Sequence, residues 1–245
     1  MLIHTTYMRE LKIIEVKSEI GAGTRGASLG IDAIKIAALD FGSRYFKQHK
    51  SVEIPNENHL LLDSAGNQYA KRISGVLTML ERVAEEICKT LKNNEFPIVL
   101  SGDHSNAAGT ISGIRKAYPK AKLGVIWIDA HGDMHSPYTT PSGNLHGMPL
   151  AVALDEDNIE SKINKPDQET INYWYQLKNV ANIAPKITYR DLVLMAVRDL
   201  EPAEEFLFKK NKIKNFSTQE IRKRGAERVA IDAHQYLDHC DLIYV

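Results

Sequence analysis

The chain has 245 residues, a length that suits one large α/β domain or two small ones. Lysine and arginine number 31, as do aspartate and glutamate, so the zero net charge excludes a strongly basic nucleic-acid-binding domain. No apolar run approaches the roughly 18 residues of a membrane span. The first residues have no apolar signal core, and the two cysteines have no metal-binding spacing. We therefore expect a cytoplasmic protein without a disulfide framework.

Short apolar runs without polar alternation predict strands that are buried on both faces of a parallel sheet. In chain order, these runs cover residues 11–16, 96–102, 123–129, 192–197 and 241–245. Helical patterns lie between them, over residues 31–46, 72–92, 106–118 and 218–239. This alternation predicts βαβ units and hence an α/β fold with a mainly parallel sheet. We predict a single domain over residues 1–245, with the polar stretch 154–170 on its surface.

The tetrapeptide IDAH occurs twice, and its first copy ends a predicted strand. In GVIWIDAHGDMHSP (residues 124–137), Asp129 and His131 follow the apolar run, and a glycine and a proline then interrupt regular structure. Residues two apart at a strand end share a face, so both side chains can point into one crevice, with Asp133 close behind. Ligands of open α/β sheets bind at such carboxyl ends, although an Asp–His pair that only caps a turn is the alternative.

The second copy of IDAH lies inside the helical pattern at residues 218–239. Asp232 and His234 would be about 200° apart around a helix with about 3.6 residues per turn. Two side chains so placed cannot easily share a ligand. The pattern predicts a half-exposed helix face without chemistry.

A second strand end supplies another histidine. The run 96–102 is followed by Asp103 and His104, and the helix predicted over 106–118 connects it to the strand of the first IDAH copy. A βαβ unit places its strands side by side or nearly so, so His104 can join the carboxylates and the imidazole of that copy. Two imidazoles and two carboxylates favour Mn²⁺ over Zn²⁺, and a carboxylate can bridge two metals.

The motifs SGDHS, WIDAHGDMHSP and SGNLHGMP, in this order, resemble the arginase branch of the ureohydrolase family, which includes agmatinases and formiminoglutamases. GAGTRGASLGIDAIKIAAL and AVRDLEPAE also match, so the resemblance runs from about Glu19 to the end. It implies a three-layer α/β/α fold, two manganese ions per subunit in the complete protein, and a homotrimer or homohexamer. The implied reaction hydrolyses arginine to ornithine and urea, with attack by a hydroxide that bridges the metals.

The resemblance also implies roles for individual residues. His104 and Asp133 would bind one metal and His131 the other, and Asp129 would bridge them as a catalytic ligand. His146 would be the proton-transferring catalytic residue. The residues implied at the amino-acid end of the substrate are Ser142 and Asn144 for the α-carboxylate, Glu201 and Glu204 for the α-amino group, and His135. His135 and Glu201 differ from the asparagine and aspartate that arginases usually carry, so other guanidino substrates such as agmatine, and formiminoglutamate, stay open as alternatives.

Two further alternatives concern the class of protein. Residues 21–26, GAGTRG, fit the dinucleotide-binding pattern G-x-G-x-x-G and so allow an NAD-dependent oxidoreductase. That pattern requires an acidic residue about 20 positions later at the end of the next strand, whereas Asp40 lies in a helical pattern. A non-catalytic member of the arginase fold is the other alternative.

The last predicted strand, residues 241–245, has only begun where the sequence stops. The resemblance implies that the continuation of this strand carries two further aspartates, which complete both metal sites. We therefore expect the 245 residues to be part of a longer chain or a truncated product. They would keep only a partial ligand set, bind manganese weakly and show no appreciable arginase activity.

Overall fold

The computed structural model describes residues 9–245, and every strand pair among them is parallel. The strands lie in two sheets, ordered β2-β1-β3 and β6-β5-β4-β7. Their bounds are β1 (Leu11–Val16), β2 (Lys50–Glu53), β3 (Phe96–Ser101), β4 (Leu123–Ile128), β5 (Leu192–Met195), β6 (Lys214–Phe216) and β7 (Leu242–Tyr244). The predicted α/β class with parallel strands is confirmed.

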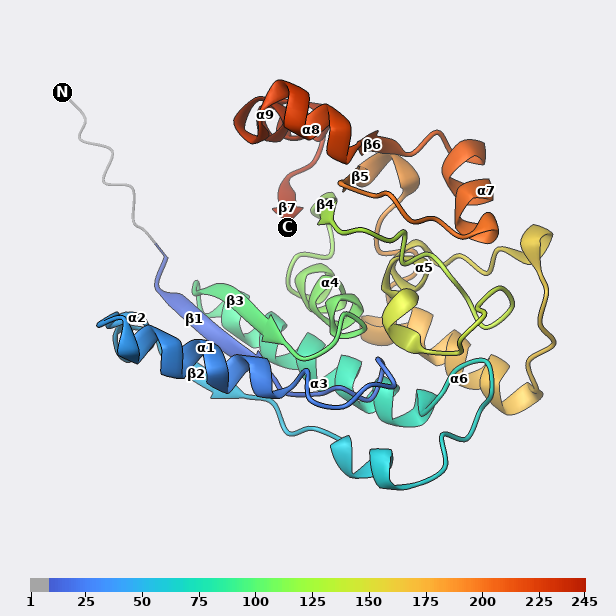
Figure 1. Cartoon of the computed structure of the whole chain (residues 1–245), viewed down its shortest axis with the longest axis horizontal. Coiled ribbons are helices and arrows are strands. Elements are labelled where there is room, and N and C mark those ends of the chain that lie inside the picture. The colour runs from blue at the N-terminus through green and yellow to red at the C-terminus, as the bar shows by residue number, and fades with distance from the viewer. Residues whose placement is uncertain (1–8) are drawn as a thin grey trace.

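Helices cover both faces of each sheet (Figure 1). They are α1 (Leu29–Asp40), α2 (Tyr45–Gln48), α3 (Ile73–Lys92), α4 (Asn106–Ala117), α5 (Pro149–Leu154), α6 (Gln168–Lys178), α7 (Pro202–Lys210), α8 (Thr218–Arg224) and α9 (Ala226–Tyr236). In the first sheet, α1 and α3 lie on opposite faces. In the second sheet, α9 packs on one face, and α4, α5 and α7 pack on the other.

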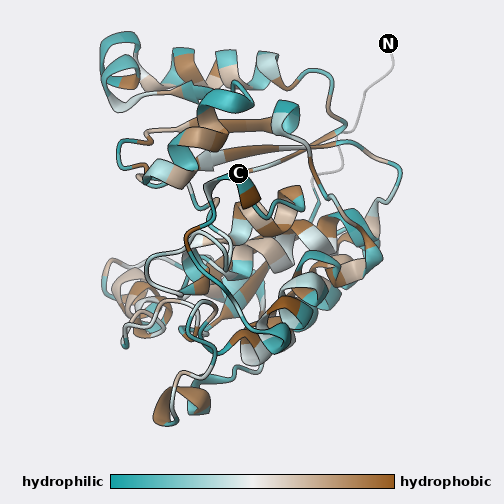
Figure 2. Ribbon diagram, turned by 90° about the vertical axis from the view of Figure 1, so that its right-hand side faces the viewer, coloured by the Kyte–Doolittle hydropathy of each residue, from teal (hydrophilic) through white to brown (hydrophobic). Residues whose placement is uncertain are grey.

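Burial on both faces explains why β4 and β5 are apolar throughout. In β4, Ile126 packs toward α9, whereas Val125 and Trp127 pack toward α4 and α5. Figure 2 shows the contrast, with strands that are largely hydrophobic and helices that alternate between hydrophobic and hydrophilic positions. A strand that is buried on both faces has no solvent-exposed positions, so its sequence does not alternate between apolar and polar residues.

The helix pair α3 and α4 sets the position of the turn that follows β3. A Cβ atom on Gly109 would lie 2.9 Å from the carbonyl oxygen of Leu80, and one on Gly113 would lie 2.6 Å from that of Ala84. Both glycines therefore allow the two helix backbones to approach closely. This contact fixes α4, which begins directly after the residues that the sequence places at the metal site.

Several features differ in detail from the sequence predictions, among them the helix predicted over 31–46, which is divided into α1 and α2. The helix predicted over 218–239 is divided into α8 and α9 at Gly225, whose φ of +85° is incompatible with a continuous helix. The polar stretch 154–170 includes the first residues of α6.

The strands β3 and β4 do not pair with each other. β3 pairs with β1, and β4 pairs with β5 and β7. An apolar pocket of about 420 Å³ lies between β3 and β7.

No helix among residues 9–245 is long and apolar enough to cross a membrane.

Candidate metal centre and active-site pocket

A network of hydrogen bonds shapes the turn between β3 and α4. Asp103 Oδ1 accepts from the Ser105 N–H (2.9 Å), and Oδ2 accepts from the Gly21 N–H (3.1 Å). A Cβ atom on Gly21 would lie 2.6 Å from Ser105 Oγ, so the first glycine of GAGTRG allows this close approach. Burial raises the pKa of Asp103, although these hydrogen bonds act in the opposite direction. The buried turn directs the next residue, His104, toward the end of β4.

Three of the four predicted metal ligands meet at the carboxyl ends of β3 and β4. His104 Nδ1 lies 3.2 Å from Asp129 Oδ2 and 3.0 Å from Asp133 Oδ2. One ligand atom from each of the three residues lies within 4.8 Å of the others. Burial would lower the pKa of His104, but the hydrogen bond to Asp133 and the charges of both aspartates outweigh it, and the pKa is raised. The arrangement is a compact set of one imidazole and two carboxylates.

The fourth predicted ligand, His131, lies at the exposed side of this group. Its Nδ1 is 3.2 Å from Asp129 Oδ1, and its backbone N–H donates to the same oxygen at 2.8 Å. The side chain is 61% exposed. Asp129 therefore lies between the two histidines, with one carboxylate oxygen directed to each.

A pocket of about 230 Å³ opens beside the metal-ligand group. It is lined by His131, Asp133, His135, Thr140, Pro141, Ser142, Asn144, His146, Gly147, Asp199, Glu201 and Glu204. All the residues that the sequence assigned to proton transfer or to the amino-acid end of the substrate are among them. The pocket therefore borders the metal-ligand group on one side and polar side chains on the other.

The two glutamates of the pocket differ in exposure. Glu201 directly precedes α7 as its N-cap and its side chain is 49% exposed, whereas that of Glu204 is only 4% exposed. The backbone N–H groups of Met134 and Glu201 donate to Glu204 Oε1 (3.0 Å) and Oε2 (3.2 Å). Burial raises the pKa of Glu204, and the nearby His135 opposes that rise. Glu204 thus connects the start of α7 to the loop that follows β4.

His135 is buried next to these glutamates. Its Nδ1 lies 3.1 Å from Thr139 Oγ1, and its Nε2 lies 3.5 Å from Glu201 Oε2 and 3.7 Å from Glu204 Oε2. Among the described residues, Nε2 has no hydrogen-bond partner. The imidazole therefore presents an unsatisfied nitrogen between the two carboxylates.

The loop that carries SGNLHG forms another part of the pocket wall. Ser142 and His146 are exposed, and Asn144 is half-buried. The backbone N–H of His146 donates to the Gly21 carbonyl oxygen at 3.1 Å. A Cβ atom on Gly23 would lie 2.9 Å from Asn144 Oδ1. The glycine-rich loop 21–26 thus packs behind this wall, which gives GAGTRG a structural role.

The sequence interpretation missed two residues at the site. Trp127 stacks on His104 with ring centroids 4.3 Å apart, and its Nε1–H donates to Asp133 Oδ2 at 3.2 Å. Asp199 lines the pocket, and its Oδ2 lies 3.9 Å from His131 Nε2. Both lie within motifs that carry other site residues, WIDAHGDMHSP and AVRDLEPAE. This proximity in the sequence was the signal that could have identified them.

Comparisons with known proteins identify the family of this chain. The model of the arginase family matches residues 9–245. The arginase of Bacillus subtilis (strain 168) is 33% identical over 97% of this chain and 74% of its own length. The chain belongs to the arginase family. Family membership places it among the hydrolases, as the sequence motifs predicted, and excludes the oxidoreductase alternative.

Two solved arginase structures share the fold. The Bacillus caldovelox arginase has a TM-score of 0.79 at 31% identity, with 96% of this chain and 74% of that chain covered. An Entamoeba histolytica arginase in complex with L-ornithine has a TM-score of 0.77 at 25% identity, with 96% of this chain and 75% of that chain covered.

The dinucleotide-binding pattern also lacks its acidic residue in the structure. Asp40 ends helix α1, whereas the pattern requires an acidic residue at the end of a strand.

The second copy of IDAH has no part in the site of this arginase-family protein. It lies in α9, where the carboxylate of Asp232 forms ion pairs with Arg224 and Arg228. The side chain of His234 is 72% exposed, and its Nδ1 lies 3.8 Å from Asp238 Oδ1. The predicted helical placement of the second copy is confirmed.

Proposed function

We propose that this protein is a manganese-dependent ureohydrolase that hydrolyses arginine to ornithine and urea. The observation that carries the proposal is the placement of His104, Asp129 and Asp133 next to a polar pocket that contains His146 and Glu201. Membership of the arginase family supports the reaction class. The two unusual residues, His135 and Glu201, lie in the pocket and bear on which guanidino compound is preferred.

The donor set fits manganese. The group of His104, Asp129 and Asp133 provides carboxylate oxygens and an imidazole nitrogen, and it contains no cysteine. His104 and Asp133 would hold one ion and His131 the other, with Asp129 between them. When bound, manganese makes water nucleophilic near neutral pH.

The chain's own residues supply proton transfer. His146 is exposed and lines the pocket, so a leaving amine in the pocket can reach its imidazole. The amine leaves only after it gains a proton, and histidine titrates in the range that this requires. Trp127 stacks on His104 and donates to Asp133, and so holds both side chains in place before any ligand arrives.

Other residues of the pocket would bind the amino-acid portion of arginine. Ser142 and Asn144 offer hydrogen-bond donors for an α-carboxylate, and Glu201 offers an exposed carboxylate for an α-ammonium group. Glu204 would act behind Glu201, because both of its oxygens already accept backbone N–H groups. The complex of a structural relative with L-ornithine supports a substrate of this kind.

The test is urea release with added Mn²⁺ from arginine, agmatine and other guanidino compounds, together with formamide release from formiminoglutamate, by the full-length gene product. We expect arginine to be the preferred substrate. Glu201→Gln should raise the KM for arginine by roughly tenfold or more with a smaller change in kcat, because a charged hydrogen bond to the ammonium group is lost.

Glu205→Gln is the matched control, since Glu205 lies on the same helix and its exposed carboxylate pairs only with Lys209 among the described residues. That variant should keep the wild-type KM. Preference for agmatine, or an unchanged KM in Glu201→Gln, would contradict the proposed substrate.

A further inference from the structure

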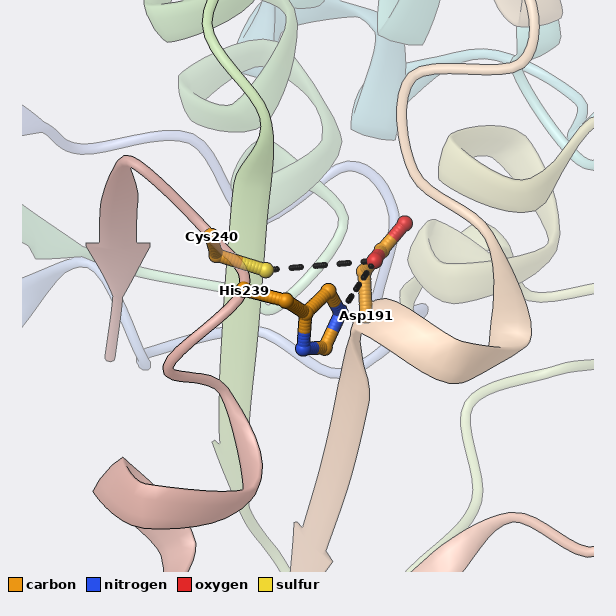
Figure 3. Close-up of side chains that lie close together, drawn as sticks. All are labelled: Asp191, His239 and Cys240. Carbon is orange, nitrogen blue, oxygen red and sulfur yellow. Dashed lines mark hydrogen bonds and ion pairs between the residues drawn. The ribbon is translucent and has the colours of Figure 1, made fainter.

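A second group of potential metal ligands lies at the opposite end of the second sheet. Asp191 directly precedes β5, at the end of a short 3₁₀ turn (Tyr189–Asp191), and His239 and Cys240 lie shortly before β7. These positions are amino-terminal strand ends, whereas the proposed manganese site lies at carboxyl-terminal ends. Figure 3 shows the imidazole and the thiol directed at the same carboxylate.

The distances suit a small metal ion. His239 Nε2 lies 2.9 Å from Asp191 Oδ1, and Cys240 Sγ lies 3.8 Å from the same oxygen. One ligand atom from each residue falls within 4.8 Å of the others. Ligands at zinc bond lengths of about 2.0–2.3 Å in tetrahedral geometry are roughly 3.3–3.8 Å apart. Small side-chain movements would therefore admit an ion.

The surrounding structure holds the ligands in position. Asp191 Oδ2 accepts from the N–H and the hydroxyl of Thr188 (3.0 and 2.7 Å), which leaves Oδ1 directed at His239 and Cys240. Gly124 of β4 makes room for the thiol, because a Cβ atom there would lie 3.2 Å from Cys240 Sγ. The carboxylate side chain is only 4% exposed. The group is thus partly preorganised.

We propose that Asp191, His239 and Cys240 form a second metal site that binds zinc or a similar thiolate-preferring divalent ion. Carboxylate, imidazole and thiolate together are typical zinc ligands, and thiolate ligation disfavours manganese. A bound ion would connect the turn before β7 to the start of β5. The site is separate from the proposed ureohydrolase centre in both position and ligand chemistry.

Lys122 is the competitor for this carboxylate. Its Nζ lies 3.3 Å from Asp191 Oδ1, and its side chain is 44% exposed, so it can move into solvent when an ion binds. Removal of its charge should therefore strengthen metal binding. If the cluster had only a structural role, removal of the Lys122 charge would not strengthen metal binding.

Titration of the 245-residue chain with Co²⁺ tests the proposal, because a cobalt–thiolate bond gives a charge-transfer absorption band in the near ultraviolet. We expect this band at one equivalent in the wild type, with Zn²⁺ displacing it. Cys240→Ser should abolish the band, and His239→Gln should weaken Co²⁺ binding by at least about 100-fold. Lys122→Met should tighten it several-fold.

Two matched variants separate the possible sites. Cys88→Ser removes the chain's other thiol, which is buried in α3, and should keep the band. His104→Ala alters the proposed manganese site and should also keep it. Circular dichroism checks that each variant is folded. The proposal is overturned if the wild type shows no band, if Cys240→Ser retains it, or if folded His239→Gln binds as tightly as the wild type.

Discussion

The tetrapeptide IDAH occupies two environments in this protein. In the first copy, Asp129 and His131 follow β4 and meet His104 at the side of a pocket. In the second copy, Asp232 and His234 lie on α9, and their partners are surface arginines and an exposed aspartate. Identical side chains in the same order thus belong to a site in one place and to a solvated helix face in the other.

The residues that follow each copy explain the difference. Gly132 follows the first copy, and a Cβ atom there would lie 2.8 Å from Glu204 Oε1, so only glycine fits without movement. Asp133 then adopts a positive φ of 50°, which turns the chain back toward His104. Gln235 follows the second copy and continues the helix. The local backbone, and not the tetrapeptide, determines whether the two side chains can share a ligand.

The largest difference should appear when the two aspartates are compared. Asp129→Asn should reduce Mn²⁺-dependent urea release by the full-length gene product to background, because the carboxylate between His104 and His131 is lost. Asp232→Asn should leave the rate unchanged. Steady-state assays at saturating Mn²⁺ make the comparison. Equal rates for the two variants would show that the first copy is not the metal site.

His146, the proposed proton-transfer residue, and His234 of the second copy give the next largest contrast. His146→Asn should lower kcat by roughly 10²–10⁴-fold while metal content stays unchanged, because general acid catalysis is lost. His234→Asn should match the wild type. Metal analysis by mass spectrometry accompanies the kinetics. A wild-type kcat in folded, metal-loaded His146→Asn would remove this residue from the mechanism.

The residues after the two copies should differ in their effect on stability. Gly132→Ala should lower the free energy of unfolding by about 1–3 kcal/mol, since the new methyl group overlaps the Glu204 carboxylate and Leu200. Gln235→Ala should be neutral or slightly stabilising, because alanine favours a helix interior. Urea denaturation of the 245-residue chain provides both values. The steric account fails if Gly132→Ala is as stable as the wild type.

The smallest effect concerns pH and the second copy. The hydrogen bond from Arg224 lowers the pKa of Asp232. A lowered pKa in the folded state stabilises the protein above the unfolded value of about 3.9, and this contribution is lost as the pH falls below it. Asp232→Asn should therefore lower the melting temperature slightly at pH 7 and less at pH 3. A difference that grows toward pH 3 would contradict this assignment.

The sequence predicted most strands well because strands such as β4 are buried on both faces and leave an uninterrupted apolar run. It did not predict the break at Gly225, since the helical pattern continues through the glycine and only the backbone conformation reveals the boundary. The helix α6 was not predicted, because its exposed face resembles a polar loop.

The site was predictable to the extent that its residues follow strand ends. His104 and Asp129 could be grouped by that rule, although β3 and β4 belong to different sheets. Trp127 was not expected at the site, because a tryptophan in an apolar run indicates only a core position. The second group was not predictable from the sequence. His239 and Cys240 are 48 and 49 positions from Asp191, and they meet it only after β4 has paired with β5 and β7.

Crystals of the 245-residue chain soaked in MnCl₂ and measured at the manganese absorption edge test the central claim most directly. The account predicts an anomalous peak within bonding distance of His104 Nδ1 and the carboxylates of Asp129 and Asp133, and none beside Asp232 or His234. A map without a peak at the first copy, in which His104 still contacts both aspartates directly, would contradict it.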